Sequence, residues 1–193
     1  KKNYVSKVEA FNVTLSQSVK QIQITHDRSQ NPAYGIILQV IAEIVDDKAD
    51  KEISEVIEEF NSGNPSEEIE EHIVQSLCSA LGEKCINIKS ASSIKLTPIF
   101  SGYRFDQLAN LKYVPTFILK VEATTRGEPI FVHTIGAGNL FRKRGIRKIG
   151  IREDLGYKKP ENILNNKDEA IKNLKLVIDE VSEMVSRYLK EGK

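Results

Sequence analysis

The residues best suited to binding chemistry form one basic stretch, FRKRGIRKIGIR, at positions 141–152. Clustered Arg and Lys side chains neutralise phosphates, in nucleic acid or on an anionic membrane surface, and release counterions on binding. No aromatic residues are interleaved with these cations as a stacking platform for single-stranded nucleic acid would require. The candidate partner-binding residues are five cations of this stretch: Arg142, Lys143, Arg144, Arg147 and Lys148.

Three interpretations of this stretch stay open. It is a solvated loop that pairs with the chain's own acidic helices, a docking segment for an anionic membrane or a partner protein, or a nucleic-acid-binding segment. The charge distribution is compatible with each, because acids dominate from Glu43 to Glu71 and bases dominate from Arg142 to Lys159. This separation of charge is the most unusual feature of a composition whose net charge is only +1.

The two cysteines, Cys78 and Cys85, are a candidate disulfide. Cys78 falls near a predicted helix end and Cys85 at the start of the next predicted strand, so a short loop would bring them together. Two small buried thiols are the alternative, since free cysteines are usually buried. The three histidines are scattered, and none has the spacing of a zinc ligand, so the sequence predicts no metal site and no cofactor.

No segment carries a recognisable catalytic motif. Gly136-Ala137-Gly138 is followed by neither Gly-Lys-Ser/Thr nor the third glycine of a dinucleotide fingerprint, so it reads as a flexible strand exit. The paired glutamates of the acidic stretch read as solvated helix faces, because catalytic carboxylates need a cleft that separates their pKa values. His133 lacks a visible partner and reads as structural. The sequence therefore predicts a protein that is not an enzyme and identifies no small-molecule substrate.

The composition indicates one globular domain. The 193 residues are 40% hydrophobic and 28% charged, and no apolar run approaches the roughly 20 residues that span a bilayer. The sequence begins at Lys1 without Met, which fits an exported chain whose leader has been removed and equally a trimmed cytoplasmic chain. We expect residues 1–18 to form a polar tether and residues 19–193 to form the domain.

The element that organises the domain is a predicted β-hairpin at Tyr113–Asn139. Phe117, Leu119 and Val121 alternate with more polar residues, which predicts one dry face. Gly127 supplies the turn, and the return strand is expected just after Pro129, which has no N–H to donate.

Helical periodicity predicts the elements that cover this hairpin: Asp50–Phe60, Ser66–Leu81 and Asp168–Leu189, the last with a capping box at Asn166 and Glu169. Further strands are expected at Gly35–Val45, at Cys85–Ile88 and at Ile94–Phe105, with an edge or a bulge at Pro98. The fold class is therefore α+β, with a largely antiparallel sheet and two or three helices packed on one face.

The order of these elements resembles that of small bacterial envelope lipoproteins of the YajG type. The matching segments run from the strand at Ile36–Val45 through EEIEEHIVQSLCSALGEK, CINI, SIKLTPIF and FILKVEATTRGEPIFVH to DEAIKNLKLVIDEVSEMVSRYL. The likeness is one of layout rather than motif, and this chain adds an acidic helix and a basic insertion. The resemblance implies an acyl chain on an upstream cysteine, a periplasmic or outer-membrane-anchored location and no enzymatic activity.

The first hypothesis is thus a non-catalytic cell-envelope protein that binds a partner protein or an anionic membrane surface through the basic segment. The alternative is a cytoplasmic nucleic-acid-binding module that uses the same residues. The identity of the partner and the oligomeric state are not encoded in any pattern of this sequence.

Overall fold

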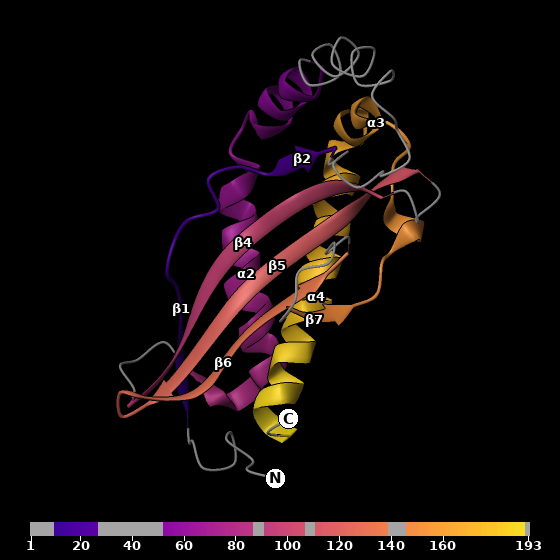
Figure 1. Cartoon of the computed structure of the whole chain (residues 1–193). Helices are drawn as coiled ribbons and strands as arrows, with labels where there is room; N and C mark the ends of the chain where they lie inside the picture. Colours follow the sequence, from indigo (N-terminus) through magenta and orange to yellow (C-terminus); the bar gives the residue numbers. More distant parts are fainter. Residues whose placement is uncertain (1–9, 27–51, 87–90, 107–110, 139–145, 192–193) are drawn as a thin grey trace, which may run out of the picture.

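The computed structural model describes residues 10–26, 52–86, 91–106, 111–138 and 146–191 (Figure 1). Over these residues seven strands form one mixed sheet in the order β3-β1-β4-β5-β6-β7, and β2 pairs with β4 beside β1. The strands are β1 Phe11–Leu15, β2 Gln23–Thr25, β3 Cys85–Ile86, β4 Ser92–Asp106, β5 Lys112–Thr125, β6 Glu128–Ala137 and β7 Ile146–Ile149. The helices are α2 Pro65–Leu81, α3 Pro160–Asn165 and α4 Lys167–Glu191, with short turns η2 Gly82–Lys84 and η3 Glu153–Leu155. Residues 52–61 are also helical, whereas the strand predicted for Gly35–Val45 lies outside the described residues.

The predicted hairpin is β5 and β6, and its dry face is confirmed. Phe117, Leu119 and Val121 are 0–1% exposed. Arg126 and Gly127 form the turn with φ of 53° and 83°, the positive values that a tight hairpin turn requires. The return strand starts at Glu128, slightly earlier than predicted, because a register irregularity opposite Ala123 and Thr124 accommodates Pro129.

An irregularity in β4 decides which of its side chains enter the core. The antiparallel register with β5 shifts between Pro98 and Phe100, so a bulge stands at the proline, as its missing N–H predicted. Before the bulge Leu96 lies opposite Val121, and after it Tyr103 lies opposite Pro115. Because the bulge inserts one residue, even-numbered side chains face the core before it and odd-numbered ones after it.

The sheet is mixed, which corrects the prediction of a largely antiparallel one. Among the described strands, β4–β5 and β5–β6 are antiparallel pairs, whereas β1–β3, β1–β4, β2–β4 and β6–β7 are parallel. The polar tether expected at residues 1–18 is also wrong over its described part, because Phe11 is fully buried and begins β1. The five residues of β1 are too short for alternation to be recognised, and a parallel partner leaves no local signal in the sequence.

The two long helices pack on each other and on the strands behind β4 and β5 in Figure 1. α4 contacts β5 and β6, α2 contacts α4 and β1, and α3 contacts α4. The α+β class is therefore confirmed, but the helices do not all pack on one sheet face. The starts of α2 and α4 fall within one residue of those predicted. The predicted capping box, in which Asn166 and Glu169 would cap the start of α4, is not formed. The side-chain amide of Asn166 donates instead to the Asn162 carbonyl of α3.

One core cluster lies between the sheet and these helices. It includes Phe11, Phe60, Tyr103, Phe117, Leu174, Val181 and Leu189, all at most 1% exposed. A second, smaller cluster joins Phe100 and Ile118 on the other face of the sheet, where the Arg104 guanidinium lies 4.1 Å from the Phe100 ring centroid. Ile118, which lies on the more polar face of the predicted hairpin, is thus fully buried.

The approach of β2 to β4 leaves no room for a side chain at Gly102. A Cβ there would lie 1.9 Å from the Gln23 carbonyl oxygen, and Gly102 has a φ of +152°. We expect Gly102→Ala to lower the free energy of unfolding by more than about 2 kcal/mol in urea denaturation. Gly150→Ala is the matched control, because a Cβ at Gly150 meets nothing within 4 Å. Equal losses in the two variants would contradict the close pairing of β2 with β4.

Candidate functional site

The structure describes two of the five predicted partner-binding residues. Arg147 and Lys148 lie on β7, an edge strand that pairs in parallel with β6. Arg142, Lys143 and Arg144 lie outside the described residues. β7 is a short strand that ends at Ile149.

Arg147 is held against the C-terminal half of α4. Its guanidinium carbon lies 4.0 Å from the ring centroid of Tyr188, which is a cation–π contact. One guanidinium nitrogen also lies 3.4 Å from Nε2 of His133 on β6. Arg147 therefore ties three elements together and is not a freely extended docking side chain.

The surroundings of His133 favour its neutral form. Its ring packs edge-on to Phe131 with centroids 4.6 Å apart. Burial lowers the pKa of His133 below its ordinary value, and the positive charge of Arg147 lowers it further. The neutral imidazole is therefore favoured at neutral pH, which fits the structural role that the sequence predicted.

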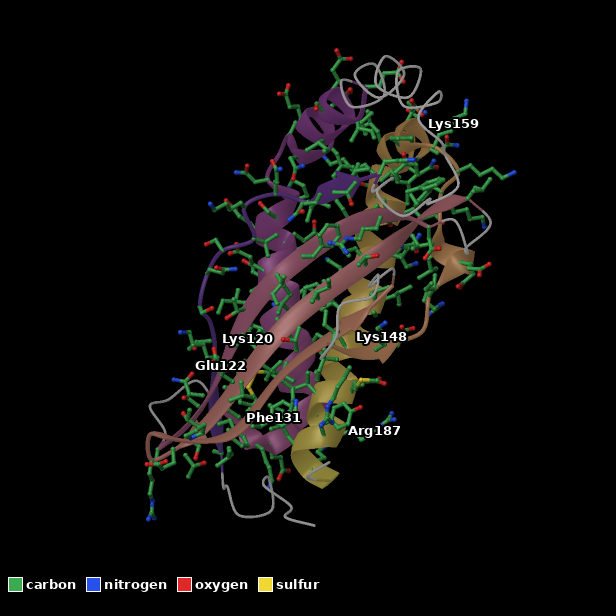
Figure 2. The ribbon with its side chains drawn as sticks, in the orientation of Figure 1. Lys120, Glu122, Phe131, Lys148, Lys159 and Arg187 are labelled. Carbon is green, nitrogen blue, oxygen red and sulfur yellow. A yellow bond between two sulfur atoms is a disulfide. The ribbon has the colours of Figure 1, made fainter. Side chains whose placement is uncertain are left out.

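Lys148 points away from the fold. It is exposed and makes no ion pair within the described residues. Figure 2 shows Lys148 and Arg187 on the same side of the molecule, where β7 lies beside the C-terminal half of α4. Arg187 is exposed as well. We call these two residues, with Arg147 behind them, the basic edge.

The next cation along the chain is neutralised within the fold. Arg152 pairs with Asp154 at 2.8 Å and with Glu180 of α4. In the acidic stretch, Glu68 pairs with Lys175 of α4 at 2.5 Å. None of these three contacts joins the basic segment to the acidic stretch. Arg152 is neutralised by acids of η3 and α4, and Lys148 makes no ion pair within the described residues.

A cluster that the sequence analysis missed joins α2 to α4. Oδ1 of Asp179 accepts a hydrogen bond from Ser76 Oγ at 2.6 Å and lies 2.8 Å from His72 Nε2. His72, Ser76 and Asp179 line a shallow hollow of about 470 Å³ together with Glu183. The i,i+4 spacing of His72 and Ser76 was visible in the sequence, but Asp179 is 107 residues from His72.

This cluster has the residue types of a catalytic triad without its geometry. A serine nucleophile needs a base that accepts its proton, and a third group that orients that base. Here both Ser76 and His72 contact the same carboxylate oxygen of Asp179, so the imidazole does not stand between the other two. The cluster functions as a polar tie between the helices.

Cys78 and Cys85 are joined by a disulfide. Cys78 lies on the last turn of α2 and Cys85 begins β3, with η2 between them. The bond therefore fixes the exit of α2 against the edge of the sheet. Of the two alternatives left open by the sequence, the structure has the bonded form.

Among the residues that the structure describes, no group of three His, Cys, Asp or Glu side chains has the arrangement of a metal site. None of the described helices combines the length and the apolar character needed to cross a bilayer. Comparison with protein-family models, with curated proteins and with solved structures found no match.

The lowered pKa of His133 makes stability depend on pH. As the pH falls through about 6.5, the unfolded chain takes up the imidazole proton before the folded chain does. The contribution of the neutral imidazole to the free energy of unfolding is therefore complete above about pH 6.5. It is lost as the pH falls toward the lower pKa that His133 has in the folded state. We expect urea denaturation to show a smaller loss for His133→Gln than for the wild type between about pH 7.5 and 5.5.

Arg147→Met should also reduce this pH dependence, because it removes the cation that opposes protonation of His133. Lys148→Met is the matched control, since it removes a neighbouring charge that does not contact His133. Identical pH profiles of stability for the wild type and His133→Gln would contradict the assignment of this pH dependence to His133.

The disulfide closes a loop with a sequence separation of 7. The loss of chain entropy on closing so short a loop stabilises a fold by about 2–3 kcal/mol. We expect the double variant Cys78→Ser/Cys85→Ser to lose about this much in urea denaturation, and dithiothreitol to affect only the wild type. Two reactive thiols in the unreduced, denatured wild type would show that the bond is absent.

Proposed function

We propose that this chain is a non-catalytic protein of the bacterial cell envelope, periplasmic and lipid-anchored, that docks on an anionic surface through its basic segment. The surface belongs to a membrane or to an acidic partner protein. The observation that carries the proposal is the basic edge: Lys148 and Arg187 are exposed on one side of the fold without ion pairs among the described residues.

The compartment is supported by the disulfide. Bonds between cysteines persist in oxidising compartments such as the periplasm and are rare in the cytosol. The Cys78–Cys85 bond fixes a helix end to the sheet and is part of the fold rather than an exposed reactive pair. A location outside the cytoplasm accounts for it without further assumptions.

Docking in this proposal is electrostatic. Each Lys or Arg near an anionic membrane surface contributes about 1 kcal/mol, and the attraction falls off within a Debye length. Arg147 is stacked on Tyr188 and holds β7 against α4, so the exposed charges are presented from a fixed surface. Arg142, Lys143 and Arg144 precede β7 in the sequence and extend the same charge.

The proposal also treats α2 and α4 as a common cover behind one face of the sheet. With that cover in place, the outer sheet face is an alternative docking surface to the edge at β7. The outer face carries the ion pair of Lys120 and Glu122, at 3.1 Å, and is close to neutral there. The edge is therefore the more favourable contact for an anionic surface.

The basic edge predicts selective binding to anionic vesicles. We expect sedimentation with vesicles that contain phosphatidylglycerol, little with phosphatidylcholine alone, and release as salt rises from about 0.05 to 0.3 M. The double reversal Lys148→Glu/Arg187→Glu should weaken this binding at least about tenfold, because it removes two attractions and adds two repulsions.

Lys95→Glu is the control for this experiment, because Lys95 is an exposed lysine on β4. An equal loss for Lys95→Glu would show that net charge alone determines binding and would contradict docking through the basic edge. Tighter binding to single-stranded DNA than to the vesicles, lost in the same double variant, would replace the proposal by the nucleic-acid-binding function.

A further inference from the structure

His133 of β6 lies beside the cations that β7 carries. The two strands pair in parallel, with Thr134 opposite Ile146 and Ile135 opposite Arg147. Because alternate side chains share one face of a sheet, His133 and Arg147 lie on the same face. The imidazole is half-buried, and its Nε2 lies 3.4 Å from a guanidinium nitrogen of Arg147. A change in the charge of His133 therefore acts directly on the basic edge.

The contact between His133 and Arg147 requires a neutral imidazole. A guanidinium has donors and no acceptor, so Nε2 of His133 has to accept the hydrogen bond and cannot carry a proton. Aromatic rings hold both partners, because Phe131 packs edge-on to the imidazole and the Tyr188 ring lies 4.0 Å from the guanidinium carbon. Protonation of His133 would replace this hydrogen bond by a repulsion between two cations.

The charged and titratable groups around His133 lie on β5, β7 and α4. On β5, Val121 is opposite His133, and its neighbours on the other sheet face are paired with each other at 3.1 Å. On β7 and α4 a guanidinium and a phenol face the imidazole, and a second guanidinium of α4 is exposed. These groups are Lys120, Glu122, Arg147, Tyr188 and Arg187. The charge that acts on the imidazole is that of Arg147, which together with burial lowers the pKa of His133.

We propose that His133 is the proton sensor of the basic edge: it is neutral in the free chain at neutral pH and takes up a proton when the edge docks. The inference rests on the proposed docking function. A negative surface offsets the repulsion from Arg147 and stabilises the protonated imidazole. Because linkage is reciprocal, protonation of His133 strengthens docking by the same factor. Docking on an anionic surface therefore tightens as the solution becomes more acidic.

The coupling is confined to a window of pH. The free chain protonates His133 only below about pH 6.5, because the pKa of this imidazole is lowered in the fold. The docked chain protonates it at a higher pH than the free chain, so docking binds up to one proton between the two pKa values. Well above this window the imidazole is neutral in both forms, and docking does not depend on its titration.

Sedimentation with vesicles that contain phosphatidylglycerol tests the coupling, because the phosphodiester of this lipid stays ionised throughout the window. We expect the wild type to bind about fivefold tighter at about pH 5.5 than at about pH 7.5, which is the effect of one additional charge near the surface. His133→Gln should bind like the wild type at the higher pH and gain less than about twofold at the lower one.

His72→Gln is the matched control, because His72 contacts Asp179 between α2 and α4 and lies apart from Arg147. It should keep the gain of the wild type. Equal gains for the wild type and His133→Gln, or loss of the gain in His72→Gln, would overturn the proposal. Binding that is independent of pH contradicts this inference alone, whereas no binding at either pH contradicts the proposed docking function as well.

The charge of His133 is also measured directly by following its imidazole resonances in the full chain against pH. We expect the pKa of His133 to be higher with bicelles that contain phosphatidylglycerol than without them, and unchanged with bicelles of phosphatidylcholine alone. In the free chain, Arg147→Met should raise this pKa, and Lys148→Met should change it less. A pKa of His133 that stays the same when the chain binds phosphatidylglycerol would overturn the proposal, even if docking tightens in acid.

Discussion

The constraint on which the fold depends is the bulge in β4. This strand pairs with β1, β2 and β5 and is 15 residues long. A regular strand of that length would turn Leu96 and Tyr103 to opposite faces, because side chains alternate with a period of two. The shift between Pro98 and Phe100 brings both into the same core. Tyr103 then donates to the Ala170 carbonyl of α4 at 2.9 Å, so the bulge also fixes the start of that helix.

The position of the bulge explains how β1 can leave the edge of β4 there. Pro98 has no N–H, and its carbonyl is bonded by Gln17, so β4 loses no donor there when β1 leaves the edge. The connection can therefore move away over a few residues without leaving buried backbone groups unpaired at Pro98. One hydroxyl, that of Ser101, remains without a partner among the described residues, and it lies opposite Phe117 on the core face of β4.

Much of the fold was predictable because its signals are local. The hairpin, the bulge at Pro98, α2 and α4 follow from alternation, helical periodicity and proline chemistry within short windows. The parallel pairing of β1 and β2 with β4 was not predictable, because the paired residues lie far apart along the chain. The disulfide was one of two alternatives, and only the distance between Cys78 and Cys85 in the fold decides between them.

The candidate sites, like the fold, were predictable only where their signals are local in the sequence. Charge along the sequence located β7, but nothing in the sequence indicated that Arg147 would stack on Tyr188 or that Arg152 would be neutralised by Glu180. These contacts join residues that are far apart in the chain, and they reduce the number of charges available for docking.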